Sequence, residues 1–143
     1  MSIYTDSDIN KVLPLIGGLY SLKVLFILCK NLINIPNSFG KLKELELLHV
    51  SNNKLHTLPL TMKNMKRLKI LNLRNNNFTE FPNIINNLNS LEELDLSGNH
   101  IETIPKEIGS LENLRIFEIY ENNLKNSPKK LEELKKKGVK VIY

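Results

Sequence analysis

The sequence predicts an α/β solenoid, in which short parallel strands form one face and irregular or short helical segments form the other. An apolar residue recurs every 23 positions with the same companions, at Leu22, Leu45, Leu68, Leu91 and Leu114. Self-similarity at a period of roughly 20 to 50 residues is typical of solenoids. The first half of each unit alternates apolar and polar residues, which indicates a short strand. The second half contains a proline, which cannot donate a ladder hydrogen bond, so the strand ends before it.

We number the positions of each unit from its first leucine. All units keep apolar residues at positions 1, 4, 6 and 11, and the fourth unit shows the whole pattern, Leu91-x-x-Leu94-x-Leu96-x-x-Asn99-x-Ile101-x-x-Ile104-Pro105-x-x-Ile108-x-x-Leu111. Over residues 22–134 this resembles the leucine-rich repeat family, in its short 23-residue form of plants and bacteria and of intracellular Ras-group-like proteins. The resemblance implies a right-handed horseshoe with a parallel concave sheet and a convex side of 3-10 or short helical segments.

We expect a single domain over residues 1–143, with five repeats over residues 22–127 between two closures. Residues 1–21 are predicted to be a cap or degenerate half-repeat: Asp6-Ser7-Asp8 favours a helix start, and Pro14 and Gly17-Gly18 interrupt the helix. Residues 128–143 are predicted to be a capping helix plus an edge strand. Ser127 suits the N-cap, Pro128 the first helical position and Gly138 the position after the last turn. Lys140 would protect the strand edge against aggregation.

Position 9 carries an asparagine in four of the units, where the chain leaves the strand and its backbone loses ladder partners: Asn53, Asn76, Asn99 and Asn122. An amide side chain both donates and accepts hydrogen bonds. The resemblance implies that these side chains stack as a structural asparagine ladder. The first unit has Lys30 at this position and Asn31 one place later, so its turn is expected to run differently.

Positions 5 and 7 flank a buried position and should project from the concave face. They predict a partner-binding surface made of Phe26, Leu28, His49, Asn72, Arg74, Asp95, Glu118 and Tyr120. With Val24 the surface begins apolar, and it becomes acidic toward Glu118. The apolar start has two interpretations: the N-terminal segment, with Ile3 or Tyr4, folds back over the first strand, or a partner or second copy covers it.

The distribution of charge and the kinds of side chain present favour some classes of function over others. The formal net charge of +5 arises entirely in residues 125–143, where seven lysines face two glutamates. This pattern favours a solvated capping helix over a nucleic-acid site, because neither aromatic residues nor arginine interleave the lysines. Cys29 and His49 lie too far apart for a nucleophile and base, and no metal or cofactor site is predicted. With no signal peptide or membrane span recognised, we expect a cytoplasmic location.

The resemblance therefore implies a non-enzymatic module that binds another protein on its concave face, as an adaptor, signalling scaffold or effector. The partner's identity stays open, and self-association is possible within this scheme. The first alternative is a structural homo-oligomer formed through the apolar first strand. A further alternative is an anionic surface or nucleic-acid binder that acts through the C-terminal lysines, for which strong salt dependence is expected.

Overall fold

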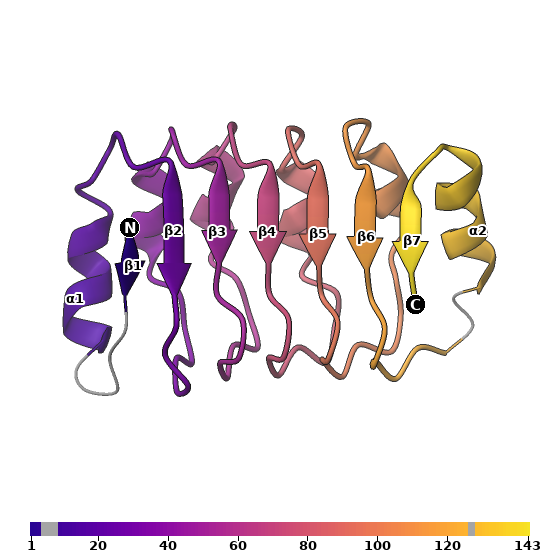
Figure 1. Ribbon diagram of the computed structural model, residues 1–143, viewed down its shortest axis with the longest axis horizontal. Helices are drawn as coiled ribbons and strands as arrows, with labels where there is room; N and C mark the ends of the chain where they lie inside the picture. Colours follow the sequence, from indigo (N-terminus) through magenta and orange to yellow (C-terminus); the bar gives the residue numbers. More distant parts are fainter. Residues whose placement is uncertain (4–8, 126–127) are drawn as a thin grey trace.

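The structure is a computed structural model that describes residues 1–3, 9–125 and 128–143. A seven-stranded parallel sheet forms one side, four 3-10 helices form the other, and an α-helix lies at each end (Figure 1). The strands follow sequence order: β1 (Ser2–Ile3), β2 (Val24–Ile27), β3 (Leu47–His49), β4 (Ile70–Asn72), β5 (Glu93–Asp95), β6 (Ile116–Glu118) and β7 (Lys140–Ile142). The predicted α/β solenoid with a parallel concave sheet is thus confirmed.

The sequence period becomes the strand register. Leu25 pairs with Leu48, Leu48 with Leu71 and Leu71 with Leu94, each one unit of 23 residues later. The step from β6 to β7 is one residue longer than the repeat, because Phe117 of β6 pairs with Val141 of β7. Equivalent side chains therefore lie beside one another across the sheet from β2 to β6.

The core is a column that runs the length of the solenoid. Positions 1, 4, 6 and 11 contribute side chains with no exposed surface in the central units, for example Leu68, Leu71, Leu73 and Phe78 in the third. A strand alone could bury none of them, but each unit covers the next. Full burial of such a side chain contributes about 1.5–3 kcal/mol, so the repeated leucines drive the stacking.

Each convex helix begins directly after a proline of the repeat. The backbone angle φ of these prolines lies between −72° and −70°, which is the value the ring imposes, and their ψ angles are extended. The proline thus ends the extended segment and starts a tight turn. The helices are η1 (Asn37–Lys41), η2 (Leu60–Asn64), η3 (Asn83–Asn87) and η4 (Lys106–Ser110).

At the N-terminal end, helix α1 (Ile9–Ile16) packs against η1, with Ile9, Leu13 and Ile16 buried. The prediction that Pro14 interrupts this helix is wrong. Pro14 lies inside α1 and removes one backbone donor, but the helix runs only two residues further, so little is lost. The proposed start at residues 6–8 lies outside the described residues.

The N-terminal strand β1 lies beside β2 as an added strand. The Met1 amine donates to the Val24 carbonyl at 2.8 Å, and the Phe26 amide donates to the Met1 carbonyl at 2.9 Å. Val24 and Leu28 remain 38% and 37% exposed. The interpretation that the N-terminal segment covers the apolar first strand is therefore wrong for residues 1–3, which extend the sheet instead; Tyr4 lies outside the described residues.

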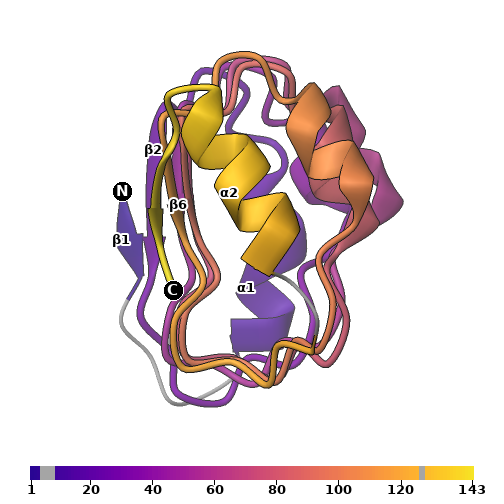
Figure 2. The same cartoon turned by 90° about the vertical axis from the view of Figure 1, so that its right-hand side faces the viewer.

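At the C-terminal end, helix α2 (Pro128–Lys136) buries Leu131 and Leu134. A helix over about residues 128–137, with Gly138 after its last turn, is what the sequence predicts, so α2 ends one residue earlier. Gly138 has a positive φ of 90°, its amide donates to Lys135, and the Val139 amide donates to Leu134. These two bonds form a Schellman motif, for which glycine suits the left-handed position. Figure 2, viewed along the solenoid, shows α2 crossing the end of the core, displaced from the stack of 3-10 helices toward the sheet. The N-cap residue Ser127 lies outside the described residues.

None of the helices in the described part of the chain is long and apolar enough to cross a membrane.

Candidate functional site

The concave face consists of three rows of side chains that the strand register aligns. Row 3 contains the residues at unit position 3; Leu47, Ile70 and Ile116 are half-buried, and Val24 and Glu93 are exposed. Row 5 contains Phe26, His49, Asn72, Asp95 and Glu118, which pair strand by strand and are all half-buried. Row 7, just beyond the strands, contains Leu28, Ser51, Arg74, Ser97 and Tyr120. All eight residues predicted for the partner surface therefore lie on one face.

The first strand supplies the apolar end of this face. The Phe26 ring lies 5.3 Å from the His49 ring, centroid to centroid, with the planes tilted by 33°. Val24 and Leu28 flank Phe26 along the strand and are exposed. Exposed aliphatic side chains beside a half-buried aromatic ring form the kind of patch that a partner covers favourably.

His49 lies where the apolar end meets the polar middle. Its Nε2 is 2.7 Å from the Ser51 hydroxyl oxygen. Burial lowers the pKa of His49, and the nearby negative charge of Asp95 opposes this shift. The lowered pKa favours the neutral ring over the imidazolium.

The middle of the face is held by hydrogen bonds around Asp95. Asn72 donates to one carboxylate oxygen at 3.1 Å, and Ser97 donates to the other from its amide at 2.9 Å and from its hydroxyl at 2.5 Å. The side-chain oxygen Oδ1 of Asn72 in turn accepts from the Arg74 backbone amide at 3.1 Å. Asp95 is thus part of a rigid network within the sheet and not a free surface charge.

Arg74 spans the centre of row 7. Its guanidinium carbon lies 5.3 Å from the centroid of the Tyr120 ring, within the range of a cation–π contact. Its Nε is buried without a hydrogen-bond partner among the described residues. A buried unpaired donor is costly, so Arg74 holds this position at the expense of a hydrogen bond at Nε.

The acidic end contains a small hollow. Its volume is about 70 Å³, and it is lined by the half-buried Ile70 and Ile116 together with Glu93, Asp95 and Glu118. Asp95 is already hydrogen-bonded, so Glu93 and Glu118 supply the accessible negative charge. The walls are aliphatic and the rim is anionic.

Sequence reasoning missed two residues of this face. Lys140 pairs with Ile116 and Ile142 with Glu118, so β7 adds a cation and an aliphatic side chain next to the acidic end. The alternation of Val139 and Val141 could have identified them: these valines face the core, so residues 140 and 142 face the concave side of the sheet. The face therefore does not end in acid but in Lys140 and Ile142.

The asparagines at position 9 lie beneath row 7 and fix the turns that support it. Asn99 donates to the carbonyls of Leu73, Leu96 and Ser97 at 2.9–3.3 Å and accepts from the Phe78 amide at 3.1 Å. Asn53, Asn76 and Asn122 make the same four kinds of bond in their units. Each asparagine thereby joins its own turn to the unit before it.

The residue before each of these asparagines has a left-handed backbone in units 2 to 5, at Asn52, Asn75, Gly98 and Glu121. Cys29 holds this position in unit 1, and it is not among the described residues with positive φ. Lys30, which stands in place of the asparagine, is exposed. The first turn therefore differs in backbone as well as in side chain.

Within residues 1–3, 9–125 and 128–143, no three His, Cys, Asp or Glu side chains are grouped closely enough to hold a metal ion. Cys29 is buried in the core and carries no disulfide. The concave face thus offers groups for binding and for orientation.

Comparison with known proteins agrees with this architecture. The family described as leucine-rich repeat region matches residues 5–137. A search among curated proteins finds no significant match. A leucine-rich-repeat protein of Leptospira interrogans superposes with a TM-score of 0.79 at 35% identity, covering 90% of this chain and 32% of that one.

Two further solved structures are similar. An internalin of Listeria monocytogenes gives a TM-score of 0.75 at 23% identity and covers 90% of this chain and 36% of its own, which shows the shared fold. A plant peptide hormone receptor, RGFR1 in complex with RGF2, gives 0.68 at 31% identity and covers 86% of this chain and 19% of its own. The chain thus spans about a third or less of the length of these relatives.

Leucine-rich repeats generally mediate protein–protein interaction, and some of the similar structures are extracellular domains. The 23-residue period, the parallel concave sheet, the convex 3-10 helices and a family match over residues 5–137 together show that this chain belongs to the leucine-rich repeat family.

Proposed function

We propose that this chain is a non-enzymatic binding module that takes a partner protein on its concave face. The observation that carries the proposal is the ordered but unpartnered sheet face, in which Asp95 is fixed by hydrogen bonds and the buried Nε of Arg74 has no acceptor. A scaffold that only had to fold would not require these groups. The plant receptor RGFR1 is similar in fold and is seen with RGF2 bound, which supports a binding role.

The chemistry of the face describes the partner. An aromatic or aliphatic side chain would cover Val24, Phe26 and Leu28, while a lysine or arginine would place its stem between Ile70 and Ile116 and its charge near Glu93 and Glu118. Seven strands about 4.8 Å apart give a floor about 30 Å long. That length fits a short helix or an extended segment, with Tyr120, Arg74 and Phe26 as the residue types that most often dominate binding.

The test is affinity capture with a charge reversal on the concave face that leaves the hydrogen bonds of Asp95 intact. Glu93→Lys combined with Glu118→Lys reverses the accessible charge, whereas Asp95→Lys would also break the bonds to Asn72 and Ser97. Glu107→Lys combined with Glu112→Lys makes the same change outside the face, at two exposed positions, and is the matched control. We expect wild type and control to retain a partner that the concave variant loses, at an unchanged melting temperature. Equal capture by all three would refute the assignment.

A cytoplasmic location belongs to this proposal. Its support is the single cysteine, which is buried and unpaired, because secreted domains of this size commonly use disulfides.

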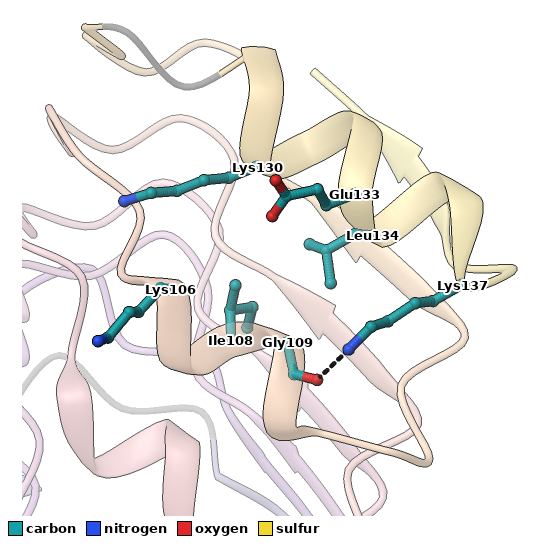
Figure 3. A pocket seen from close by; sticks show the side chains of 7 residues that line it. All are labelled: Lys106, Ile108, Gly109, Lys130, Glu133, Leu134 and Lys137. Atoms are coloured by element: carbon teal, nitrogen blue, oxygen red, sulfur yellow. Dashed lines mark hydrogen bonds between the residues drawn. The ribbon is translucent and has the colours of Figure 1, made fainter.

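The C-terminal lysines are a weaker candidate for an anionic or nucleic-acid partner. Four of the seven are already engaged within the molecule. Lys130 donates to the Ile104 carbonyl, Lys137 to the Gly109 carbonyl (Figure 3) and Lys135 to Glu132, and Lys125 forms an ion pair with Glu102 at 2.8 Å. These intramolecular contacts account for more than half of the C-terminal lysines. We therefore infer a protein partner and not a nucleic acid.

Self-association is the second candidate function, and one observation favours it. Leu15 and Tyr20 are 74% and 62% exposed at the N-terminal end, near Val12 and Leu19. The opposite end carries the lysines of α2 and does not match this apolar surface, so a second copy would dock through the same end by a two-fold axis. Light scattering over a concentration series should show a dimer that Leu15→Glu abolishes. Leu60→Glu, at an equally exposed leucine on η2, is the control, and a concentration-independent monomer would rule this function out.

A further inference from the structure

A narrow aliphatic stripe runs across the strands on the concave face. It is formed by row 3, in which Val24, Leu47 and Ile70 lie in register on neighbouring strands. Val24 is 38% exposed, and Leu47 and Ile70 are half-buried, so all three present apolar surface to the solvent. Contiguous apolar surface of this kind is a site that another molecule can cover.

Polar side chains border the stripe on both sides. At the margin where the strands begin, unit position 2 carries charges of alternating sign that pair between units at 3.9 Å: Lys23 with Glu46, Lys69 with Glu92 and Arg115 with Glu92. On the other side, the centre of row 5 contains His49, Asn72 and Asp95. The apolar surface over β3 and β4 is therefore one side chain wide.

The stripe becomes acidic at β5. Glu93 occupies row 3 there and is exposed, while Glu118 lies on the next strand. Both carboxylates line the hollow of about 70 Å³ between Ile70 and Ile116. Neither forms an ion pair with another residue that the structure describes. This end of the stripe therefore has unbalanced negative charge beside aliphatic surface.

The spacing of row 3 distinguishes a helical ligand from an extended one. Neighbouring strands lie about 4.8 Å apart, whereas side chains on one face of an extended chain recur about every 6.7 Å. On an α-helix, the positions i, i+4 and i+7 share one face and advance about 5.3 Å per step. Over three steps the helix departs from the row by about 1.4 Å, which a slight tilt removes. The extended chain departs by about 6 Å, which is more than a whole strand.

We propose that the concave face receives an amphipathic α-helix laid across the strands, with its apolar stripe on Val24, Leu47 and Ile70 and a lysine or arginine over Glu93 and Glu118. This inference rests on the proposed function, because it names the kind of partner segment that the face binds. Charge complementarity sets which end of the helix lies over β5 and β6, namely the basic end. From β2 to β6 the face spans about 19 Å, the length of about thirteen helical residues.

The experiment is a titration of the full chain with designed peptides, followed by the methyl resonances of Leu47 and Ile70. The probe is an alanine- and glutamine-rich peptide with leucines at i, i+4 and i+7 and an arginine at i+11, one for each strand from β2 to β5. Its control carries the same residues at alternate positions, so that only an extended chain presents them on one face. We expect saturable shifts with a dissociation constant of about 0.1–1 mM for the helical probe and binding about tenfold weaker for the control.

The conformation of the bound peptide is a second readout. Transferred nuclear Overhauser effects between successive amide protons should be strong for the helical probe. A proline at the centre of the probe breaks the helix and should abolish the shifts.

Variants of the chain locate the peptide. Ile70→Thr keeps a β-branched residue in the strand but removes an apolar contact, so affinity should fall about three- to tenfold. Leu60→Thr removes an exposed leucine on η2, outside the face, and is the matched control that should leave the affinity unchanged. Glu93→Gln combined with Glu118→Gln should weaken binding about threefold, but not for a probe with glutamine in place of arginine.

The helix inference would be overturned by equal or tighter binding of the alternating control, by binding of neither peptide, or by shifts that survive the central proline. The proposed function fails separately, when the concave charge reversal leaves partner capture unchanged. A chain that loses its partner on charge reversal but prefers the alternating peptide binds on this face without a helix.

Discussion

The two ends of the solenoid close the same core in different ways. Each end buries an apolar stripe of a short helix, Leu13 and Ile16 in α1 and Leu131 and Leu134 in α2. Their outer surfaces differ, because α1 exposes Leu15 while α2 exposes Lys129, Glu132, Glu133 and Lys136. A capping unit needs a polar outer side for solubility.

Polar contacts also fasten the C-terminal cap. Lys130 and Lys137 bridge α2 to carbonyls of the fourth unit, and Lys135 lies over the Tyr143 ring at 4.5 Å. Burial of an inner apolar stripe thus closes a solenoid, whereas the polarity of the outer side of the cap determines how readily that end associates with another molecule.

The largest effect should come from the inner stripes, and it should be similar at both ends. Leu13→Ala and Leu131→Ala each remove a side chain that is 1% exposed, so we expect each to lower the free energy of unfolding by about 2–5 kcal/mol in urea titrations. Leu15→Ala, on the outer side of α1, should change it by less than about 0.5 kcal/mol. A large effect of Leu15→Ala would mean that α1 is packed on both sides.

The next largest effect should be a difference in stability loss between replacing an inner asparagine of the ladder and replacing its last asparagine. Asn99 is 2% exposed and makes four hydrogen bonds, so Asn99→Leu leaves the Phe78 amide unpaired and should cost about 2–3 kcal/mol. Asn122 is half-buried near the C-terminal end, and Asn122→Leu should cost less because water can replace part of its bonds. Thermal denaturation of both variants measures this, and equal losses would contradict the difference between the interior and the end.

The Schellman motif predicts a smaller effect that is confined to one end. Gly138→Ala places a Cβ at a φ of 90°, where the space is open but the backbone is strained, and should cost about 1 kcal/mol. Hydrogen exchange should localise the change to α2 and β7. Gly18→Ala is the control at the other end, since Gly18 has no positive φ, and it should have less effect.

The smallest effect should be a pH dependence of the C-terminal cap alone. Hydrogen bonds from Lys135 and Tyr143 lower the pKa of Glu132. A carboxylate with a depressed pKa in the folded state stabilises above its unfolded pKa, and this contribution is lost as the pH falls through the folded value. The protection of α2 amides against exchange, measured relative to their unstructured rates, should therefore fall on acidification below about pH 4, more than in α1. Glu132→Gln should remove this difference, and an equal response of both helices would contradict the assignment.

The repeat period predicted which residues lie on the concave face, but it did not predict which of the charged side chains are already hydrogen-bonded. Positions 5 and 7 identified Phe26, Arg74 and Tyr120 as concave residues because strand side chains alternate. The same pattern gave no means to distinguish Asp95 from Glu118. Asp95 is engaged by Asn72 from the neighbouring strand and by Ser97 from its own, and the former contact exists only once strands 23 residues apart lie side by side.

The sequence by itself determined the stacking, because a one-sided apolar strand repeated every 23 residues is stable only when its neighbours cover it. It also marked the asparagine row and the irregular first turn at Lys30. How the ends close depends on the tertiary structure: β1 lies beside β2 and not over it, and a Cβ on Gly109 would meet only the Lys137 amine of the layer that follows. These features depend on packing distances between layers, which a local pattern does not encode.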